Sequence, residues 1–117
     1  MNVAADLDLD DVFAALADPT RRAIVIRLAA GDATVLELAK PFAISLPAIS
    51  RHLKVLEHSG LISRGRDRQT RPCRLQPDAL AVVANWAEHT RIAWQQRLDQ
   101  LATFLAEDLR SINKEKS

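Results

Sequence analysis

After Pro77 the chain contains no further proline or glycine, the two residues that most often interrupt a helix. Pro77 followed by Asp78 is a favourable helix start, so one helix is predicted over residues 77–112. At about 1.5 Å per residue this helix would be roughly 54 Å long, more than a chain of 117 residues can cover with its own core. A break into two helices that fold back on each other is the alternative.

This segment also carries an apolar seam with approximate three-and-four spacing and some gaps. The seam consists of Ala87, Trp94, Leu98, Leu101, Leu105 and Ile112. The simplest cover for it is the same helix of a second subunit, because two-fold dimers are the commonest soluble assembly. The residues predicted at the interface of this homodimer are Phe13, Trp86, Trp94, Leu98, Leu101 and Leu105.

The composition favours a mainly α-helical globular protein. Alanine (19) and leucine (16) outnumber valine and isoleucine (7 each), and the hydrophobic fraction of 48% argues against disorder. A single cysteine excludes an intramolecular disulfide framework. Because residues 1–11 hold four aspartates without lysine or arginine, and no apolar run is long enough for a membrane span, we expect a soluble, cytoplasmic protein with no membrane partner.

The formal net charge of +1 conceals an uneven distribution. Residues 1–44 carry four basic and seven acidic side chains, and residues 76–117 carry five and six. Residues 45–75 hold seven basic side chains against Glu57 and Asp67, a net charge of +5. Such a concentration is expected where a protein meets phosphates, although a solvated arginine-rich loop would look the same.

Three helices are predicted before this basic segment. The first spans residues 9–17, and the second begins with Asp18 as N-cap, buries Ile24, Ile26 and Leu28, and stops at Gly31. Thr34 and Glu37 form a capping box at the start of a short third helix that ends before Pro41.

A fourth helix is predicted from the N-cap Ser45 to about Ser59, with Gly60 ending it. Ile49, Leu53 and Leu56 fall on one side of the helical wheel and form its buried stripe. The opposite face is small, polar and basic, which together with the preceding short helix is typical of a DNA-reading helix-turn-helix, or of an ordinary solvated helix. That face carries Pro47, Ser50, Arg51, Lys54 and His58.

A basic β-hairpin is predicted next. Arg64, Arg66 and Arg68 alternate along a first strand and therefore share one face of it. A turn at residues 67–69 leads to a return strand over residues 71–75, which Pro72 should interrupt or confine to an edge. A hairpin in this position is the wing of a winged helix-turn-helix.

With these elements in order, the chain resembles the ArsR/SmtB family of bacterial winged-helix repressors over roughly residues 9–108. The resemblance is carried by ALADPTRR at residues 15–22, by SLPAISRHLKVLEHSGLI at residues 45–62, by the basic wing and by the tryptophan-bearing last helix. It implies a homodimer that binds a palindromic operator in double-stranded DNA and represses transcription. The C-terminal helices and the first helix would form the dimer interface, and DNA binding would associate the protein with the nucleoid.

The metal ligands of this family's sensors are missing from this sequence. Residues 35–42 contain no cysteine or histidine, and the last helix offers only His89 as a nitrogen ligand. A zinc site built from Cys73, His52, His58 and His89 would need four scattered residues to converge. We therefore predict no metal and no cofactor, and the chain resembles the branch of the family whose effectors are varied or unknown, which leaves room for a small-molecule effector.

The candidate DNA-binding residues form two groups. The major-groove candidates are Ser45, Pro47, Ser50, Arg51, His52 and Lys54, of which Arg51 can make a bidentate contact to guanine or a plain phosphate contact. His52 could equally hold the helix against the body of the protein. The wing candidates for phosphate or minor-groove contact are Arg64, Arg66, Arg68 and Arg71.

The predicted organisation is an acidic arm (1–8), a winged helix-turn-helix core (9–76), a dimerisation helix (77–112) and a flexible tail (113–117). No catalytic constellation is present, so no enzyme is predicted. Two alternatives remain: a repressor of the same fold that responds to metal or redox through Cys73, whose arginine neighbours would favour a reactive thiolate on an exposed hairpin, and a winged helix used for protein contacts. The basic excess argues against the second.

Overall fold

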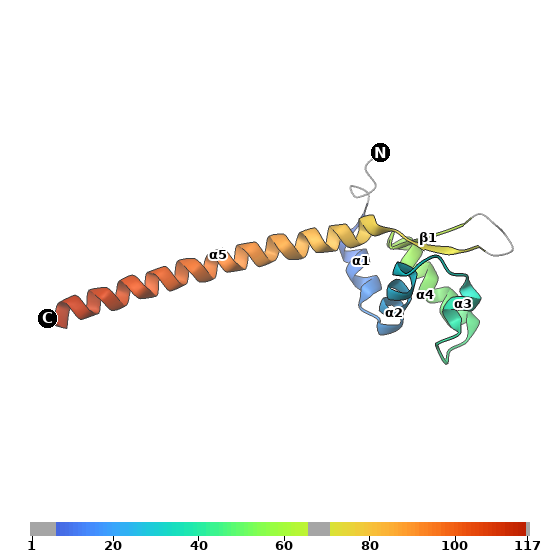
Figure 1. Cartoon of the computed structure of the whole chain (residues 1–117), viewed down its shortest axis with the longest axis horizontal. Coiled ribbons are helices and arrows are strands. Elements are labelled where there is room, and N and C mark those ends of the chain that lie inside the picture. The colour runs from blue at the N-terminus through green and yellow to red at the C-terminus, as the bar shows by residue number, and fades with distance from the viewer. Residues whose placement is uncertain (1–6, 66–70, 117) are drawn as a thin grey trace. The chain divides into compact units, whose positions relative to one another are not determined.

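The structure is a computed structural model that describes residues 7–65 and 71–116 (Figure 1). The chain divides into two compact units, residues 1–83 and residues 84–117. The predicted fold is confirmed: a mainly helical protein with one two-stranded antiparallel sheet. Its elements are α1 (Leu9–Leu16), α2 (Pro19–Ala29), α3 (Val35–Ala39), α4 (Leu46–His58), β1 (Ile62–Arg64), β2 (Cys73–Leu75) and α5 (Pro77–Lys116).

The helices of the first unit begin at the caps that the sequence predicted. The Asp18 carboxylate accepts from the Arg21 backbone N–H at 3.0 Å, and the Ser45 hydroxyl accepts from the Ala48 N–H at 3.3 Å. The capping box at α3 is complete, because Thr34 Oγ1 accepts from the Glu37 N–H at 3.2 Å and Glu37 Oε1 accepts from the Thr34 N–H at 3.1 Å. These short-range bonds fix the limits of the helix-turn-helix.

The core of the first unit is built from one side of each helix. In α4 the predicted stripe of Ile49, Leu53 and Leu56 is fully buried. In α2 the prediction for Ile26 is wrong, since this side chain is 73% exposed and Val25 is buried in its place. Two residues along a helix correspond to a rotation of roughly 200°, so Ile26 faces away from the core that Ile24 enters.

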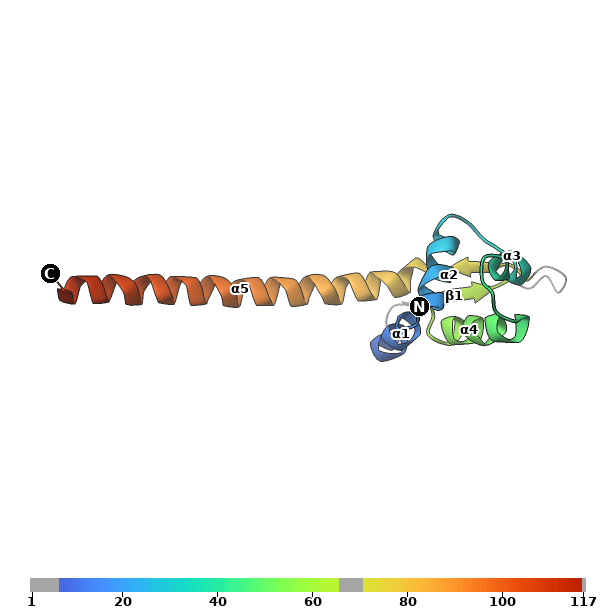
Figure 2. The same ribbon diagram turned by 90° about the horizontal axis from the view of Figure 1, so that it is seen from below.

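The hairpin follows α4 directly, and its two strands lie side by side (Figure 2). Gly60, which has a φ of +84°, makes the turn out of α4, and a Cβ there would collide with Leu7. β2 begins after Pro72, as predicted, and is shorter than residues 71–75. Its other edge pairs with the segment before α3, where the Cys73 N–H donates to the Ala33 carbonyl at 2.7 Å.

α5 is a single helix of 40 residues, so the alternative with a break is wrong for this segment. Two limits also differ from the predicted organisation. Ala79 is buried and Val83 packs against the core, so the compact first unit ends at Val83 rather than at residue 76. The helix also continues to Lys116, where a flexible tail was predicted, because residues 113–116 contain no helix breaker and Lys114 is favourable near a helix C-terminus.

Candidate nucleic-acid interface

α4 presents a polar and basic surface opposite its buried stripe. Arg51 and Lys54 are exposed, and Ser50 between them on the wheel is half-buried. Pro47 occupies the first turn, and the exposed Ser45 is engaged through its hydroxyl as the N-cap. Five of the six predicted major-groove residues therefore lie on the outer side or at the start of α4, and His52 is the exception.

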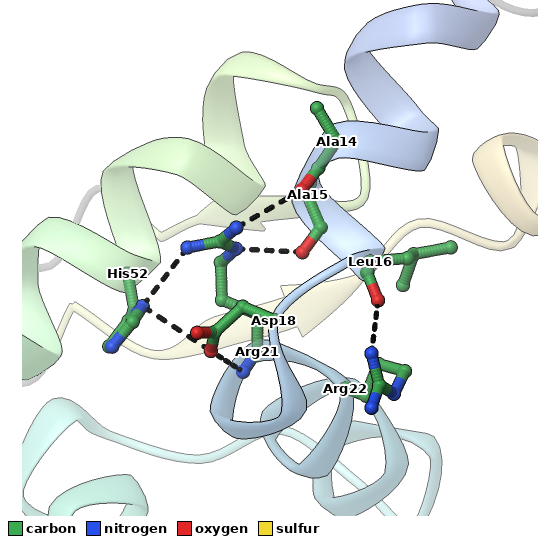
Figure 3. Close-up of polar contacts among 7 residues, drawn as sticks. All are labelled: Ala14, Ala15, Leu16, Asp18, Arg21, Arg22 and His52. Carbon is green, nitrogen blue, oxygen red and sulfur yellow. Dashed lines mark hydrogen bonds and ion pairs between the residues drawn. The ribbon is translucent and has the colours of Figure 1, made fainter.

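His52 is half-buried and takes part in a polar cluster that joins α1, α2 and α4 (Figure 3). The Arg21 guanidinium donates through Nε to the Ala15 carbonyl at 2.7 Å and through Nη2 to the Ala14 carbonyl at 3.1 Å. Its Nη1 lies 3.3 Å from Nδ1 of His52. Arg21 thus caps the last carbonyls of α1 and holds α4 through His52.

The geometry of this contact defines the protonation of the imidazole. A guanidinium has only donors, so His52 Nδ1 must accept, which requires a neutral ring with its proton on Nε2. Asp18 Oδ2 lies 3.9 Å from the same nitrogen. The Arg21 N–H, and to a smaller extent the charges of His52 and Arg21, hold the pKa of the Asp18 carboxyl below its usual value. The carboxylate therefore contributes to stability above the carboxyl's unfolded-state pKa, and this contribution is lost as the pH falls through the lowered folded-state pKa.

Replacing His52 distinguishes a positioning role from direct contact with DNA. Asn places an acceptor oxygen near the position of Nδ1, whereas Gln places its amide near Nε2. We expect His52→Asn to keep the ratio of specific to random DNA binding within about twofold, and His52→Gln to reduce it about tenfold, the effect of one lost hydrogen bond of about 1.4 kcal/mol. Competition binding on both variants measures this, with circular dichroism to establish that they are folded. A variant series in which Gln preserves the ratio and Asn loses it would assign His52 to DNA contact.

Sequence reasoning missed part of this surface. Arg21 lies in a groove of about 340 Å³ that it lines together with Ala48, Arg51, His52 and Val55, but 31 residues separate it from His52 in the sequence, so no local pattern could identify the pair. The apolar side chain of Leu46, at the start of α4, is 48% exposed. Its position beside Ser45 and Pro47 makes it a candidate for contact with a thymine methyl group.

The wing arginines have different surroundings. Arg64 is half-buried rather than freely exposed, because it stands opposite the buried Cys73 in the hairpin register, and its Nε atom is buried. Arg71 is exposed, with a φ of +32°. Arg74 donates from Nε and Nη2 to Asp32 Oδ2 at 3.1 and 3.0 Å, so its charge is neutralised within the protein. Arg66 and Arg68, and the predicted turn at 67–69, lie outside the described residues.

The expectation of an exposed, reactive Cys73 is wrong. The side chain is fully buried between Arg64 of β1 and Ala33 of the loop before α3. Burial raises the pKa of the Cys73 thiol above its ordinary value, outweighing the opposite effect of Arg64 and Arg71. The thiolate needed for redox chemistry is therefore disfavoured.

An alkylation experiment tests this directly. In the folded protein at neutral pH, iodoacetamide should modify Cys73 on the order of a hundredfold more slowly than in denaturant, because reaction requires local opening. Mass spectrometry over time measures both rates. Rapid modification with retained helical circular dichroism would contradict the buried, protonated thiol.

The remaining candidates concern metal and the dimer interface. Within residues 7–65 and 71–116, no three His, Cys, Asp or Glu side chains are placed to hold a metal ion. None of the helices in this same part of the chain is long and apolar enough to cross a membrane. Phe13 is half-buried on α1, whereas the α5 candidates Trp86, Trp94, Leu98, Leu101 and Leu105 are between 48% and 59% exposed.

Comparison with known proteins agrees with this geometry. A helix-turn-helix domain family model matches residues 16–64. The chain is 46% identical over 74 residues to the HTH-type transcriptional regulator Rv2034 of Mycobacterium tuberculosis, covering 63% of this chain and 69% of that protein. It is 40% identical over 78 residues to the transcriptional repressor SdpR of Bacillus subtilis, covering 67% of this chain and 87% of that protein.

Solved structures extend the comparison. The crystal structure of the ArsR family transcriptional regulator RHA00566 matches with a TM-score of 0.71 and 41% identity, over 74% of this chain and 96% of that one. A homodimeric winged helix-turn-helix DNA-binding domain from Mycobacterium bovis, Mb0332, matches with a TM-score of 0.56 and 25% identity, over 74% and 79% of the two chains. The chain belongs to the ArsR/SmtB family of winged helix-turn-helix transcriptional regulators.

Proposed function

We propose that this protein is a homodimeric repressor that binds a palindromic operator, with one α4 helix in each of two successive major grooves. The observation that carries the proposal is the outer face of α4, where exposed Arg51 and Lys54 stand over a fully buried apolar stripe. A helix held by its apolar side and open on its basic side can enter a major groove without rearrangement. The similarity to the repressor SdpR supports repression as the outcome of binding.

The residues have distinct proposed roles. Arg51 reads a guanine through its two parallel donors, and Ser50 reaches a neighbouring base edge. Lys54 contacts phosphate, as do the exposed Arg71 and, from the hairpin, Arg66 and Arg68. Ser45 and Pro47 set the approach of the first turn of α4. Arg64 and His52 are positioned to support the hairpin and α4 from within the protein.

The dimer is proposed from α5. Along this helix, within residues 84–115, every large apolar side chain is more than two-fifths exposed, including Trp94, Leu98 and Leu101. A contiguous apolar surface of this kind requires a partner. The homodimeric state of the similar domain Mb0332 supports a second copy of the chain as that partner.

Two further statements follow from the proposed role. The family consists of DNA-binding regulators, and we assign this protein regulation rather than catalysis. A repressor acts on chromosomal DNA, so we place this protein in the cytoplasm, associated with the nucleoid when bound.

Selection from a random duplex library tests the proposal. The full chain should enrich a palindrome whose half-sites lie about one helical turn, roughly 10 base pairs, apart. Binding of the enriched duplex should be followed by mobility shift. Failure to enrich any sequence over several rounds at low salt would contradict sequence-specific binding.

A further inference from the structure

The exposed seam of α5 has an internal symmetry that bears on how two copies pair. Its apolar members, spaced alternately four and three residues apart, define a coiled-coil seam with eight positions between residues 87 and 112. Six positions are apolar and two are charged. The eight are Ala87, Arg91, Trp94, Leu98, Leu101, Leu105, Asp108 and Ile112.

The two charged positions are opposite in sign and equally far from the centre of the seam. The centre falls between Asp99 and Gln100, and Arg91 and Asp108 lie on either side of it at the same distance. The apolar positions are also mirrored about this centre: Leu98 with Leu101, Trp94 with Leu105, and Ala87 with Ile112. Such a mirrored seam is self-complementary when two copies run in opposite directions.

We propose that two α5 helices pair antiparallel about this centre, so that Arg91 of each chain forms an ion pair with Asp108 of the partner subunit. The inference rests on the proposed homodimer and adds its direction and register. Trp94 then packs against the partner's Leu105, and Leu98 against the partner's Leu101 next to the two-fold axis. All eight positions are matched in this one arrangement.

The donors of Arg91 are compatible with this pairing. In the single chain its Nε donates to Glu88 Oε2 at 3.1 Å and its Nη2 donates to Glu88 Oε1 at 2.7 Å. These bonds hold the guanidinium on the helix surface, where the side chain stays 63% exposed. Nη1 takes no part in the Glu88 contact and is left to meet a second carboxylate.

Other arrangements of the same helix oppose like charges or bury unpaired ones. In a parallel pair each residue faces its own copy, so Arg91 would meet the partner's Arg91 and Asp108 the partner's Asp108. An antiparallel pair shifted by one heptad would place Arg91 against the partner's Leu101. A charge left unpaired among apolar side chains is costly, so the two charged positions select the register as well as the direction.

Charge reversal tests the pairing. Arg91→Asp places two aspartates together at each of two symmetry-related sites, and Asp108→Arg places two arginines there. Each single variant should weaken dimerisation on the order of tenfold or more, and the double variant Arg91→Asp/Asp108→Arg should return to within about threefold of the natural chain. A parallel pair predicts no loss for either single variant, because wild type already opposes like charges.

The matched control is Arg110→Asp, a reversal on α5 outside the seam, which should leave the dimer unchanged. Sedimentation equilibrium on the full chains measures the dimerisation constants, and circular dichroism establishes that each variant is helical. Unweakened single variants, or a double variant no better than the singles, would overturn the pairing while leaving the dimer intact. A wild-type chain that is monomeric at micromolar concentration would instead overturn the proposed homodimer itself.

Discussion

Leu101→Glu is expected to convert the protein to a monomer at micromolar concentration and to lower its affinity for a two-half-site duplex by about a hundredfold or more. Leu101 is 53% exposed in the single chain and lies beside the centre of the α5 seam. Two glutamates near the two-fold axis would be buried against apolar side chains without partners. Because each DNA-binding unit then acts alone, the gain from binding two linked sites is lost.

The control for this variant is Ala106→Glu, which adds the same charge at an exposed position of α5 outside the seam. Leucine, alanine and glutamate are all good helix formers, so neither change should unwind the helix. Sedimentation and mobility shift on both variants give the two readouts. If Leu101→Glu stayed dimeric, the seam would not be the dimer interface.

Arg51→Ala is expected to remove the preference for operator over random duplex. A bidentate arginine–guanine contact contributes about 1–3 kcal/mol of discrimination, and a two-fold operator contains the contact twice. The expected loss of specific binding is therefore at least about thirtyfold, while binding to random duplex should fall only slightly. The exposed position of Arg51 predicts little change in thermal stability.

Lys54→Ala is the matched comparison, one turn further along the exposed side of α4. A phosphate contact carries no sequence information, so this change should weaken operator and random binding alike and reduce the slope of log K against log salt by about one. Competition binding at several salt concentrations separates the two variants. Equal losses of specificity from Arg51→Ala and Lys54→Ala would contradict the assignment of roles.

The sequence predicted most of the fold because its signals are local. Asp18, Thr34 and Ser45 each bond to an amide three residues away, so their capping roles follow from short spacing. The buried stripe of α4 follows from helical periodicity in the same way. The error at Ile26 arose in α2, where apolar residues stand next to one another and do not define a single face.

The parts that could not be predicted depend on contacts between distant segments. The burial of Cys73 comes from its pairing with Ala33, 40 residues earlier, and the neutralisation of Arg74 comes from Asp32. The Arg21–His52 contact likewise joins α2 to α4 across the core. In each case a residue type that indicates chemistry on an exposed surface is engaged by a partner that spacing does not reveal.

The most direct measurement is the stoichiometry and salt dependence of the full chain on its selected duplex, compared with the same duplex after one half-site is scrambled. We predict two chains per intact duplex, an affinity that falls steeply as salt rises, and a large loss of affinity when either half-site is scrambled. One chain per duplex, or equal affinity for the intact and scrambled sequences, would contradict a dimer that reads an operator through α4.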